Sequence, residues 1–535
     1  MTDLGRQKKY MKNSNLLSNL KQDLPASIVV FFVALPLCLG IALASGAPLF
    51  SGLIAGIIGG IVVGALSGSQ VGVSGPAAGL AAIVLTAIGS LGGFENFLLA
   101  VVLGGIIQLL FGVLRAGIIG YYFPSSVIKG MLTGIGIIII IKQIPVFFGY
   151  DSPEGGFSLT EMGGVINAIS PGATVIAVVS LGILLLWSNI LSKKGKIFQL
   201  IQGPLVAVIA GIIYELFSHG NSVWQIKAKQ LVSVPVPNDF TSFIGQFSFP
   251  NFSQISNPEI WVTAFTIALV ASLETLLCVE ATDKLDPEKR VTPTNRELIA
   301  QGTGNFISGM IGGLPVTQVI VRSSANIQSG GKTKLSAIIH GFFLLISVML
   351  IPTLLNKIPL SVLAAVLFIV GYKLAKPSLF KSMYKLGWKQ FIPFIITILG
   401  IVFTDLLIGI GLGLIVGITI ILIKSFQNSH FLHIEDKSDG KHRIKMTLAE
   451  EVTFINKGAI LKELDALPEG TLLELDVKGT RFLDYDIIEI FEDFSEKARQ
   501  RNINIKIQSE RGTVDNPDSF VDFFNQPPKS VTDKV

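Results

Sequence analysis

The sequence predicts a multi-pass α-helical membrane protein that ends in a small soluble α/β domain. Half of the 535 residues are apolar, only 15% are charged, and 55 are glycine. The mean hydropathy of +0.63 is far above that of an ordinary soluble protein. Apolar runs of about 20 residues, the length that crosses a bilayer as a helix, recur through residue 425, and a soluble pattern follows them.

Residues 1–23 form a basic and polar segment before the first apolar run. This segment has no short apolar stretch with a small-residue cleavage site, so we expect no cleaved signal peptide. We expect a transmembrane domain over 24–428, a linker over 429–439 and a C-terminal domain over 440–535. Cys38 and Cys278 lie inside apolar runs and are interpreted as small hydrophobic side chains rather than as a disulfide.

Lysine and arginine gather in a few places, which set the expected orientation. The positive-inside rule assigns these places to the cytoplasm. Loops that are poor in basic residues for their length are assigned to the outside. The basic places are the N-terminal segment, 192–196, 283–290, 330–334 and 373–389, and the outer loops are 147–171 and 219–258.

Twelve apolar runs suit spanning helices, but twelve crossings do not bring every basic cluster to one side. Two further crossings, 70–91 and 316–330, resolve this conflict; each has a strand-like start and a short apolar or small-residue continuation. Both termini are then cytoplasmic. The fourteen expected crossings are 24–45, 48–66, 70–91, 94–115, 122–145, 172–192, 200–218, 259–282, 296–313, 316–330, 335–357, 360–376, 388–404 and 407–425.

The two strand-like crossings resemble each other. SQVGVSGPA at 69–77 aligns with TQVIVRSSA at 317–325, and a weaker match joins FVALPLCL at 32–39 to TIALVASL at 266–273. Seven crossings in each half would make the halves inverted repeats, because an odd number of crossings reverses orientation. Paired, interrupted segments in two inverted halves indicate the substrate site of a transporter. The alternative is chance similarity between segments rich in glycine, valine and serine.

These two segments have the properties of an anion site. Extended backbone at membrane depth must pair or line a wet cavity, and two short antiparallel strands could pair with each other. Where each strand passes into a half-helix, near Gly75 and Ser323, free N–H groups and the helix dipole favour an anion. The small residues Ala77 and Ala78 permit close approach to the backbone. Arg322 adds a permanent charge that binds oxyanions bidentately.

Glu274, in the eighth crossing, is the expected partner of Arg322, because an unpaired charge in the membrane is costly. The alternatives are that Arg322 contacts substrate or only balances Glu274, and that Glu274 binds a coupling proton or cation or is a static counter-ion. Glu280, Asp283 and Asp405 are interpreted as solvated or helix-capping residues. The lone His340 is interpreted as a buried core residue.

The chain resembles the SulP family of anion transporters over nearly its whole length. The resemblance is carried by DLPASIVVFFVALPLCLGIALASG, GSQVGVSGPAAG, ETLLCVEATD and ELIAQGTGNFISGMIGGLPVTQVIVRSSANIQSGGKT. It implies seven plus seven inverted segments, with a core domain that carries the anion past a gate domain in an elevator-like motion. It also implies substrate contacts from the first, third, eighth and tenth segments. The residues at the family's positions are Arg322, Ser323, Glu274, Ala77, Leu37, Cys38 and Ile41.

Two departures from the family pattern bear on coupling. The first segment reads Pro36-Leu37-Cys38-Leu39, without the glutamine that many members have there. In the cyanobacterial sodium–bicarbonate branch the eighth segment carries an aspartate and a threonine. Here Glu274 and Cys278 stand at those places, and the tenth segment has Gln318-Val319-Ile320 instead of a small Gly-Ala-Thr run. These differences favour proton coupling or exchange over sodium.

From residue 440 the pattern alternates as in a soluble α/β domain. Strands are expected near 443–447, 451–454, 471–477 and 503–508, and helices near 456–467 and 485–500. DVKGTRFLDYDIIEIFEDF resembles the STAS domain that ends SulP chains. Related regulatory domains carry a phosphorylatable serine after the aspartate, but here the run is Asp484-Tyr485-Asp486. We therefore expect a role in stabilising the protein or its dimer.

Together these features predict a secondary transporter of a small inorganic anion, bicarbonate or sulfate first, by proton symport or exchange. The alternatives are sodium-coupled bicarbonate uptake, dicarboxylate transport, an uncoupled anion channel and a nucleobase permease. No clustered metal ligands, nucleophile–base set or nucleotide loop suggests an enzyme or a cofactor. We expect a homodimer in a bacterial inner membrane and no nucleic-acid partner.

Overall fold

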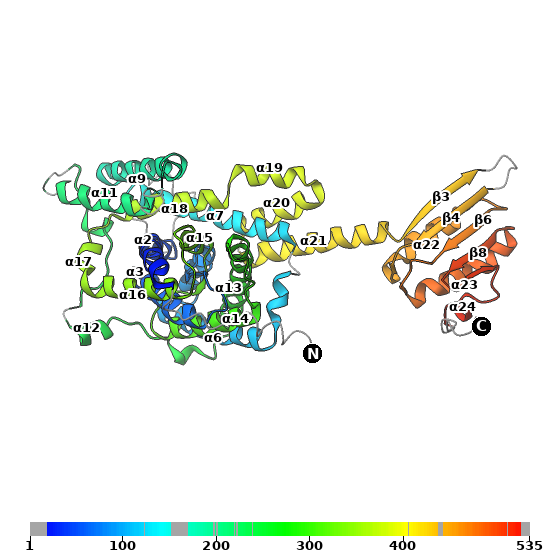
Figure 1. Ribbon diagram of the computed structural model, residues 1–535, viewed down its shortest axis with the longest axis horizontal. Helices are drawn as coiled ribbons and strands as arrows, with labels where there is room; N and C mark the ends of the chain where they lie inside the picture. Colours follow the sequence, from blue (N-terminus) through cyan, green and yellow to red (C-terminus); the bar gives the residue numbers. More distant parts are fainter. Residues whose placement is uncertain are drawn as a thin grey trace. The chain divides into compact units, whose positions relative to one another are not determined.

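The structure is a computed structural model that describes residues 19–121, 124–150, 169–195, 198, 202–218, 220, 223–237, 239–404, 406–436, 442–510 and 512–525. Two compact units divide the chain, one ending at Leu414 and the other starting at Ile415, and each is described by itself. Figure 1 shows the helices of the first unit and the sheet of the second. Residues 1–18 of the expected N-terminal segment, and Asp405, lie outside the described residues.

Each of the fourteen expected crossings falls on a helix or on a strand followed by a helix. The first seven are α2 (Leu20–Ala44); α3 (Leu49–Ile58) with the π-helical turn η2 (Gly59–Val63) and α4 (Gly64–Leu66); β1 (Ser74–Pro76) with η3 (Ala78–Leu80) and α5 (Ala81–Ser90); α6 (Phe94–Val113); α7 (Ser125–Phe147); α9 (Pro171–Asn189); and α11 (Gly203–Ser218).

The second half follows the same plan. Its crossings are α13 (Pro258–Leu285); α14 (Thr294–Met310); β2 (Val316–Gln318) with α15 (Ile320–Gln328); α16 (Leu335–Leu350) with α17 (Pro352–Leu355); α18 (Leu360–Leu374); α20 (Trp388–Phe403); and α21 (Leu406–Gln427). Short helices lie between crossings: η4 (Ala116–Tyr121), η6 (Leu191–Lys193), η7 (Ala228–Gln230), α12 (Phe240–Ile244), η8 (Phe252–Gln254) and α19 (Pro377–Lys385).

Most of these helices are long and apolar enough to cross a membrane. In the described residues, eight helices meet that requirement alone, and four shorter apolar helices add to them. α14 and α15 are not among these twelve, because α14 carries a row of polar residues and α15 has only nine residues. Both have a buried face that includes polar side chains. Polar groups and interrupted backbone are tolerated at membrane depth only inside the protein or beside a wet cavity.

The strands β1 and β2 pair with each other, which confirms the antiparallel pairing expected from the sequence. Ser74 lies opposite Gln318, Gly75 opposite Thr317 and Pro76 opposite Val316, and all six residues are buried. The first residue of each strand therefore faces the last residue of the other. A two-fold axis through the Gly75–Thr317 pair would produce this register, as inverted halves require.

The register also corrects the alignment of the two halves. The sequence match aligned Ser74 with Arg322, but β1 begins at Ser74 and β2 at Val316. The helices that follow begin at Ala78 and Ile320. By position after the strand, Arg322 therefore corresponds to Leu80. The identical residues in the sequence alignment therefore reflect the similar composition of the two segments. They do not occupy equivalent positions in the two strands.

Glycine allows the helices around the strands to approach closely. A Cβ on Gly105 of α6 would lie 2.4 Å from the backbone nitrogen of Phe306 on α14. A Cβ on Gly60 would lie 2.7 Å from the Cα of Gly341, where η2 crosses α16. Such close approach at glycine is typical of packed membrane helices.

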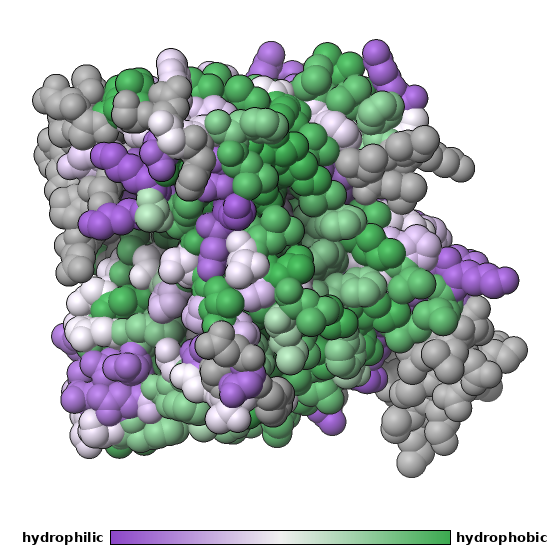
Figure 2. All heavy atoms as spheres, turned by 90° about the vertical axis from the view of Figure 1, so that its left-hand side faces the viewer, coloured by the Kyte–Doolittle hydropathy of each residue, from purple (hydrophilic) through white to green (hydrophobic). Residues whose placement is uncertain are grey.

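The outer surface of the first unit is apolar. Side chains such as Val178 on α9 and Leu216 on α11 are more than half exposed. Figure 2 shows broad hydrophobic areas on the face seen there. Because this surface would be unfavourable in water, it matches a protein embedded in lipid.

The second unit is an α/β domain built on a five-stranded sheet. The sheet order is β3-β4-β6-β8-β9, with β4, β6 and β8 parallel and the outer strands antiparallel. Its elements are β3 (His430–Asp436), β4 (His442–Leu448), β5 (Glu451–Val452), η9 (Phe454–Asn456), α22 (Lys457–Asp465), β6 (Leu472–Asp476), β7 (Phe482–Leu483), α23 (Tyr485–Gln500), β8 (Asn504–Ser509), β9 (Gly512–Asp515) and α24 (Phe520–Asn525).

The alternation seen in the sequence places one face of this sheet in the core. Met446, Leu475 and Ile507 are fully buried in the cluster that also holds Phe491 of α23. The domain starts earlier than the sequence pattern suggested, because β3 occupies part of the range 429–439 that was expected to be a linker. Its residues pair along the whole of β4, which compensates for the irregular polar pattern of HFLHIED.

Candidate functional site

Arg322 is the largest fully buried side chain in the described part of the molecule. It belongs to the first turn of α15, one turn after β2 ends. Its Nη2 donates to the Cys38 sulfur on α2 at 3.3 Å, whereas Nε and Nη1 have no hydrogen-bond partner. A thiol is a weak acceptor. The guanidinium is therefore a buried cation whose hydrogen bonds are largely unmade, a state that costs several kcal/mol unless an anion completes it.

Two glycines make room for this guanidinium. A Cβ on Gly75 of β1 would lie 2.1 Å from Nη1, and a Cβ on Gly56 of α3 would lie 2.5 Å from the Cys38 sulfur. Both side-chain positions are thus filled by Arg322 and its partner. Arg322 of α15 thus meets strand β1 and helix α2 at one point. The structure brings together there three residues expected from the sequence to form the site, Arg322, Gly75 and Cys38.

Glu274 does not form the ion pair with Arg322 that the sequence analysis expected. Its carboxylate faces Gly79, where a Cβ would lie 2.6 Å from Oε2, and Oε2 has no hydrogen-bond partner. No ion pair joins the two residues within the described part of the chain. The pairing fails because Arg322 reaches toward α2 and β1, whereas Glu274 approaches the same segment from α13, at η3. The two charges flank opposite ends of residues 75–79.

Backbone donors without an intrahelical partner lie at the start of both half-helices. Ala77 precedes η3 and Val319 precedes α15, and neither supplies a side-chain cap. In α15 the first backbone bond to Val319 is made by Ser323, so the N–H groups before it have no intrahelical partner. These donors and Arg322 lie on the same first turn. Such a turn favours an anion through both its N–H groups and its dipole.

The loop that leads into β1 is held by three polar side chains of the β2–α15 segment. Asn326 donates to the Val71 carbonyl at 3.0 Å, and Ser323 accepts from the Val73 N–H at 3.0 Å. Gln318 packs against Gly72, where a Cβ would lie 2.8 Å from its Nε2. Ser323 also donates to the Val319 carbonyl at 2.9 Å, so its proton is already used within the fold. Ser323 was expected to lie beside Arg322, and in the structure it also helps to hold the loop before β1.

A polar row on α14 holds both strands, and the sequence analysis missed it. Gln301 donates to Ser74 of β1 at 2.7 Å and to Glu297 at 3.0 Å. Asn305 accepts from the backbone N–H of Val316, at the start of β2, at 2.5 Å. Glu297, Gln301 and Asn305 are at most 1% exposed. Their four-residue spacing, which puts them on one face of a helix, was the available signal.

Glu297 extends this row to the loop before β1. Its Oε2 accepts from the Ser67 hydroxyl at 2.6 Å and from the Gly68 N–H at 3.1 Å. At the other end, Asn305 also donates to Gln108 of α6 at 2.7 Å. The two strands therefore rest on a hydrogen-bonded network that continues into α6.

The remaining sequence-named residues lie around this centre. Leu37, Ile41 and Ala77 are buried, and Ala78 is partly buried at the start of η3. Cys278 is partly exposed on α13, one turn after Glu274. His340 is buried as expected; its Nδ1 donates to the Ala337 carbonyl at 2.5 Å, and its ring lies against Gly60.

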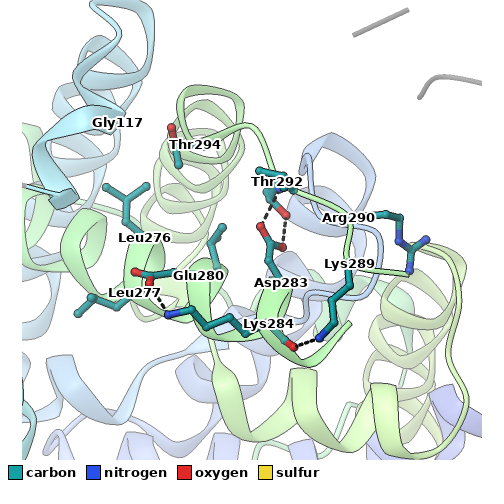
Figure 3. A pocket seen from close by; sticks show the side chains of 12 residues that line it. Gly117, Leu276, Leu277, Glu280, Asp283, Lys284, Lys289, Arg290, Thr292 and Thr294 are labelled. Carbon is teal, nitrogen blue, oxygen red and sulfur yellow. Dashed lines mark hydrogen bonds and ion pairs between the residues drawn. The ribbon is translucent and has the colours of Figure 1, made fainter. Parts of the chain in front are cut away.

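A cavity of about 370 Å³ lies at the end of α13 (Figure 3), and neither Arg322 nor Glu274 lines it. Glu280 pairs there with Lys284 at 2.5 Å, and Asp283 accepts from the backbone and hydroxyl of Thr292 at 2.7 Å each. These contacts agree with their interpretation as solvated or capping residues.

Asp286 ends this segment just beyond α13. Burial raises the pKa of Asp286, but hydrogen bonds from Arg290 outweigh this effect, and the net pKa lies below the ordinary value. Asp286 thus stays charged and ties the loop to Arg290 rather than to the centre around Arg322.

Comparisons with known proteins agree with this architecture. A model described as the sulfate permease family matches residues 20–397. The bicarbonate transporter BicA of Picosynechococcus sp. is 27% identical over 443 residues, which cover 81% of this chain and 75% of that protein. The putative sulfate transporter YvdB of Bacillus subtilis is 26% identical over 427 residues, covering 78% of this chain and 77% of that protein.

Solved structures show the same fold. The transmembrane domain of a cyanobacterial bicarbonate transporter BicA matches with a TM-score of 0.65 at 27% identity, over 74% of this chain and 98% of that one. A structure of SLC26A9 matches with a TM-score of 0.74 at 16% identity, over 92% of this chain and 84% of that one. The second match extends into the C-terminal unit.

Proposed function

The chain belongs to the sulfate permease family of membrane transporters, and we propose that it is a secondary active transporter of a small inorganic oxyanion bound at Arg322. Its family and its relatives are transporters and not enzymes. The observation that carries the proposal is the buried guanidinium with Nε and Nη1 unpartnered. Bicarbonate and sulfate are the leading substrates, because relatives are named for them and because both suit a guanidinium.

The anion would lie between the first turn of α15 and the β1–η3 segment. There it can accept from Arg322 and from N–H groups in the first turn of α15 that have no intrahelical partner, and neither Gly75 nor Ala77 has a bulky side chain that would block the approach. The thiol of Cys38 would give up its contact with Nη2 to a stronger acceptor. Ala78 and Ile41 would form apolar walls, which strengthen the electrostatic attraction by excluding water.

We assign coupling to Glu274. A buried carboxylate without a cationic partner is neutralised most simply by a proton or a metal cation. The carboxylate stands at Gly79, at the end of the segment that Arg322 touches at Gly75. Protonation there would change the charge that the anion meets, which supports proton symport or exchange.

Sodium is the alternative coupling ion. Sodium needs several oxygen ligands, but the residue one turn after Glu274 is Cys278, a sulfur donor that suits soft metals. The sulfur of Cys278 at this place supports a proton over sodium.

We further propose an elevator-like motion and a cytoplasmic location for both termini in a bacterial inner membrane. The paired strands support the first, because they make one body of the β1, β2 and α14 segments. The basic loops support the cytoplasmic location of the termini.

The C-terminal unit has a parallel β4-β6-β8 sheet and the helix α23, which fit a STAS domain. We propose that this unit stabilises a homodimer.

An uncoupled channel, dicarboxylate transport and nucleobase transport remain alternative functions. A channel needs no buried carboxylate, so Glu274 favours a coupled carrier. A nucleobase carries no permanent negative charge that would require the guanidinium of Arg322. A dicarboxylate would need a second cation, and no other arginine or lysine lies in the fully buried set of described residues.

The test replaces Arg322 with alanine and, separately, with lysine. Purified protein is placed in liposomes, and labelled bicarbonate, sulfate or oxalate is added outside them. Uptake of the label is measured at two pH values, with and without sodium. Arg322→Ala should weaken anion binding by about a hundredfold, because two charge-assisted hydrogen bonds contribute roughly 3 kcal/mol. Lysine should restore charge but not the bidentate contact. Arg115→Ala, at an exposed arginine, is the control. Full uptake by folded Arg322→Ala would refute the site.

A further inference from the structure

The turn between α18 and α20 combines exposed lysines with exposed aromatic and aliphatic residues. α18 ends at Leu374 and α20 begins at Trp388, and the short helix α19 (Pro377–Lys385) lies between them. We name the exposed residues of this turn the α19 surface. They are Lys376, Lys381, Tyr384, Lys385, Leu386, Trp388 and Lys389.

One side of α19 is used for packing. Met383 is fully buried, Phe380 contacts Phe394 with ring centroids 5.2 Å apart, and Tyr384 contacts Phe391 at 5.4 Å. These contacts hold α19 beside the first turns of α20, as Figure 1 shows. The tight reversal at Gly387, with φ of 93°, makes this possible. α19 is therefore a fixed surface helix with one face left free.

The free face is basic and carries no acidic residue. Between Leu374 and Gln390 the sequence contains lysines but neither aspartate nor glutamate. In the part of the chain that the structure describes, none of the four lysines of the α19 surface forms an ion pair, and Lys389 lies 6.0 Å from the ring centre of Trp388. Lys381 and Lys385 are four residues apart and so share one face of the helix. Their charge is not balanced within the chain.

The exposed aromatic and aliphatic residues of the α19 surface indicate which kind of anion it binds, a free phosphate or a phospholipid. Tyr384, Leu386 and Trp388 are 71%, 62% and 59% exposed, which is unfavourable in water. A free phosphate would use only the lysines. A phospholipid at the bilayer surface would use both, because tryptophan and tyrosine lie at the headgroup level and lysine reaches its charge to the phosphate. The residues around α19 belong to a candidate membrane span over Leu360–Lys385 and to the shorter apolar helix α20. We therefore place this polar and aromatic turn at the level of the headgroups.

We propose that the α19 surface binds the headgroups of anionic glycerophospholipids. The lysines contact the phosphate and the negatively charged leaflet, and Trp388 and Leu386 insert among the glycerol and upper acyl groups. The surface joins two crossings of the transport unit, so lipid bound there contacts both. The proposal does not depend on which anion is carried, because it concerns binding outside the centre around Arg322.

The test uses the fluorescence of Trp388, which becomes the only tryptophan when the other three, Trp187, Trp224 and Trp261, are replaced by phenylalanine. The full chain is placed in phosphatidylcholine vesicles with a trace of brominated phosphatidylglycerol or of brominated phosphatidylcholine. Brominated phosphatidylglycerol should quench Trp388 several-fold more strongly. Lys381→Gln with Lys385→Gln should remove this preference, and Lys462→Gln with Lys497→Gln, at exposed lysines of the second unit, should keep it.

Equal quenching by the two brominated lipids would overturn the proposal. So would relief of quenching by soluble glycerol 3-phosphate, since that result would indicate a site for free phosphate. Should the three phenylalanine replacements prevent folding, the otherwise unchanged chain is released from detergent in a mass spectrometer. The number of retained phosphatidylglycerol molecules should then fall in the Lys381→Gln, Lys385→Gln variant only, and an unchanged number would refute the proposal.

Discussion

The guanidinium of Arg322 occupies the space in which a side chain on Gly75 would lie, since a Cβ there would be 2.1 Å from Nη1. This contact joins the two halves of the transport unit at its centre. It also explains why the backbone of β1 can approach the positive charge without a side chain between them.

Gly75→Ala should therefore reduce transport strongly without removing the charge. The new methyl group must displace Arg322, because the backbone of β1 is held by β2 and cannot retreat. We expect uptake to fall at least about tenfold, corresponding to roughly 1.4 kcal/mol. Gly89→Ala, in a part of α5 where a Cβ meets nothing within 4 Å, is the control and should transport normally. Normal uptake by Gly75→Ala would show that Arg322 has another position available.

Glu274→Gln tests coupling separately from binding. Glutamine keeps the shape of the side chain against Gly79 but can neither take up nor release a proton. We expect the variant to lose accumulation driven by a pH gradient and to retain exchange of labelled for unlabelled anion. Glu280→Gln, at an exposed residue paired with Lys284, should behave as the wild type. Unchanged proton-driven accumulation would assign Glu274 a purely structural role.

Cys38 reports on occupation of the centre. The chain has only two cysteines, so Cys278→Ala leaves Cys38 as the sole thiol. An anionic methanethiosulfonate reagent that enters the open site should modify Cys38, and a saturating transported anion should slow this reaction several-fold. The reason is the 3.3 Å contact between the Cys38 sulfur and Arg322, which anion and reagent would both need. A reaction rate that is independent of the anion would place the substrate elsewhere.

Hydropathy and charge predicted the crossings and the paired strands, because both follow from local pattern. Extended backbone inside a membrane has few ways to satisfy its hydrogen bonds, and pairing with the matching strand of the other half is one of them. The alignment of the halves was less reliable. Repeated valine, glycine and serine matched Ser74 with Arg322, whereas by position in the strands Ser74, the first residue of β1, corresponds to Val316, the first residue of β2.

Side-chain direction was the part that could not be read from the sequence. Arg322 and Glu274 were expected to pair because they were the two charges near the centre. In the structure they approach residues 75–79 from different helices and meet different glycines. The row Glu297, Gln301 and Asn305 was readable in principle, since polar residues spaced by four within a crossing must face protein rather than lipid.

Gln301→Leu tests the support that α14 gives to the strands. The change removes the Gln301 donor from the Ser74 hydroxyl and from Glu297 Oε1, and such losses cost about 1–3 kcal/mol each. We expect a lower midpoint of thermal unfolding in detergent and weaker anion binding at a temperature where the variant is folded. Thr303→Val, two residues away on α14, removes only a bond to its own helix and is the control. Equal unfolding midpoints for Gln301→Leu and the wild type would mean that α14 does not support β1 through Gln301.

His430 should make the second unit less stable in mild acid. Burial lowers the pKa of His430, and the opposing attraction of Glu463 is weaker. Between the ordinary pKa of 6.5 and the lower folded pKa, the unfolded state binds more protons, so stability is complete above pH 6.5 and decreases as the pH falls. Hydrogen exchange of β3 and β4 amides in the full chain, corrected for the intrinsic pH effect, should accelerate over this interval. His430→Gln should remove the acceleration and His433→Gln, at an exposed histidine of β3, should keep it. If His433→Gln removed the acceleration and His430→Gln kept it, the effect would belong to His433 on the exposed face of β3.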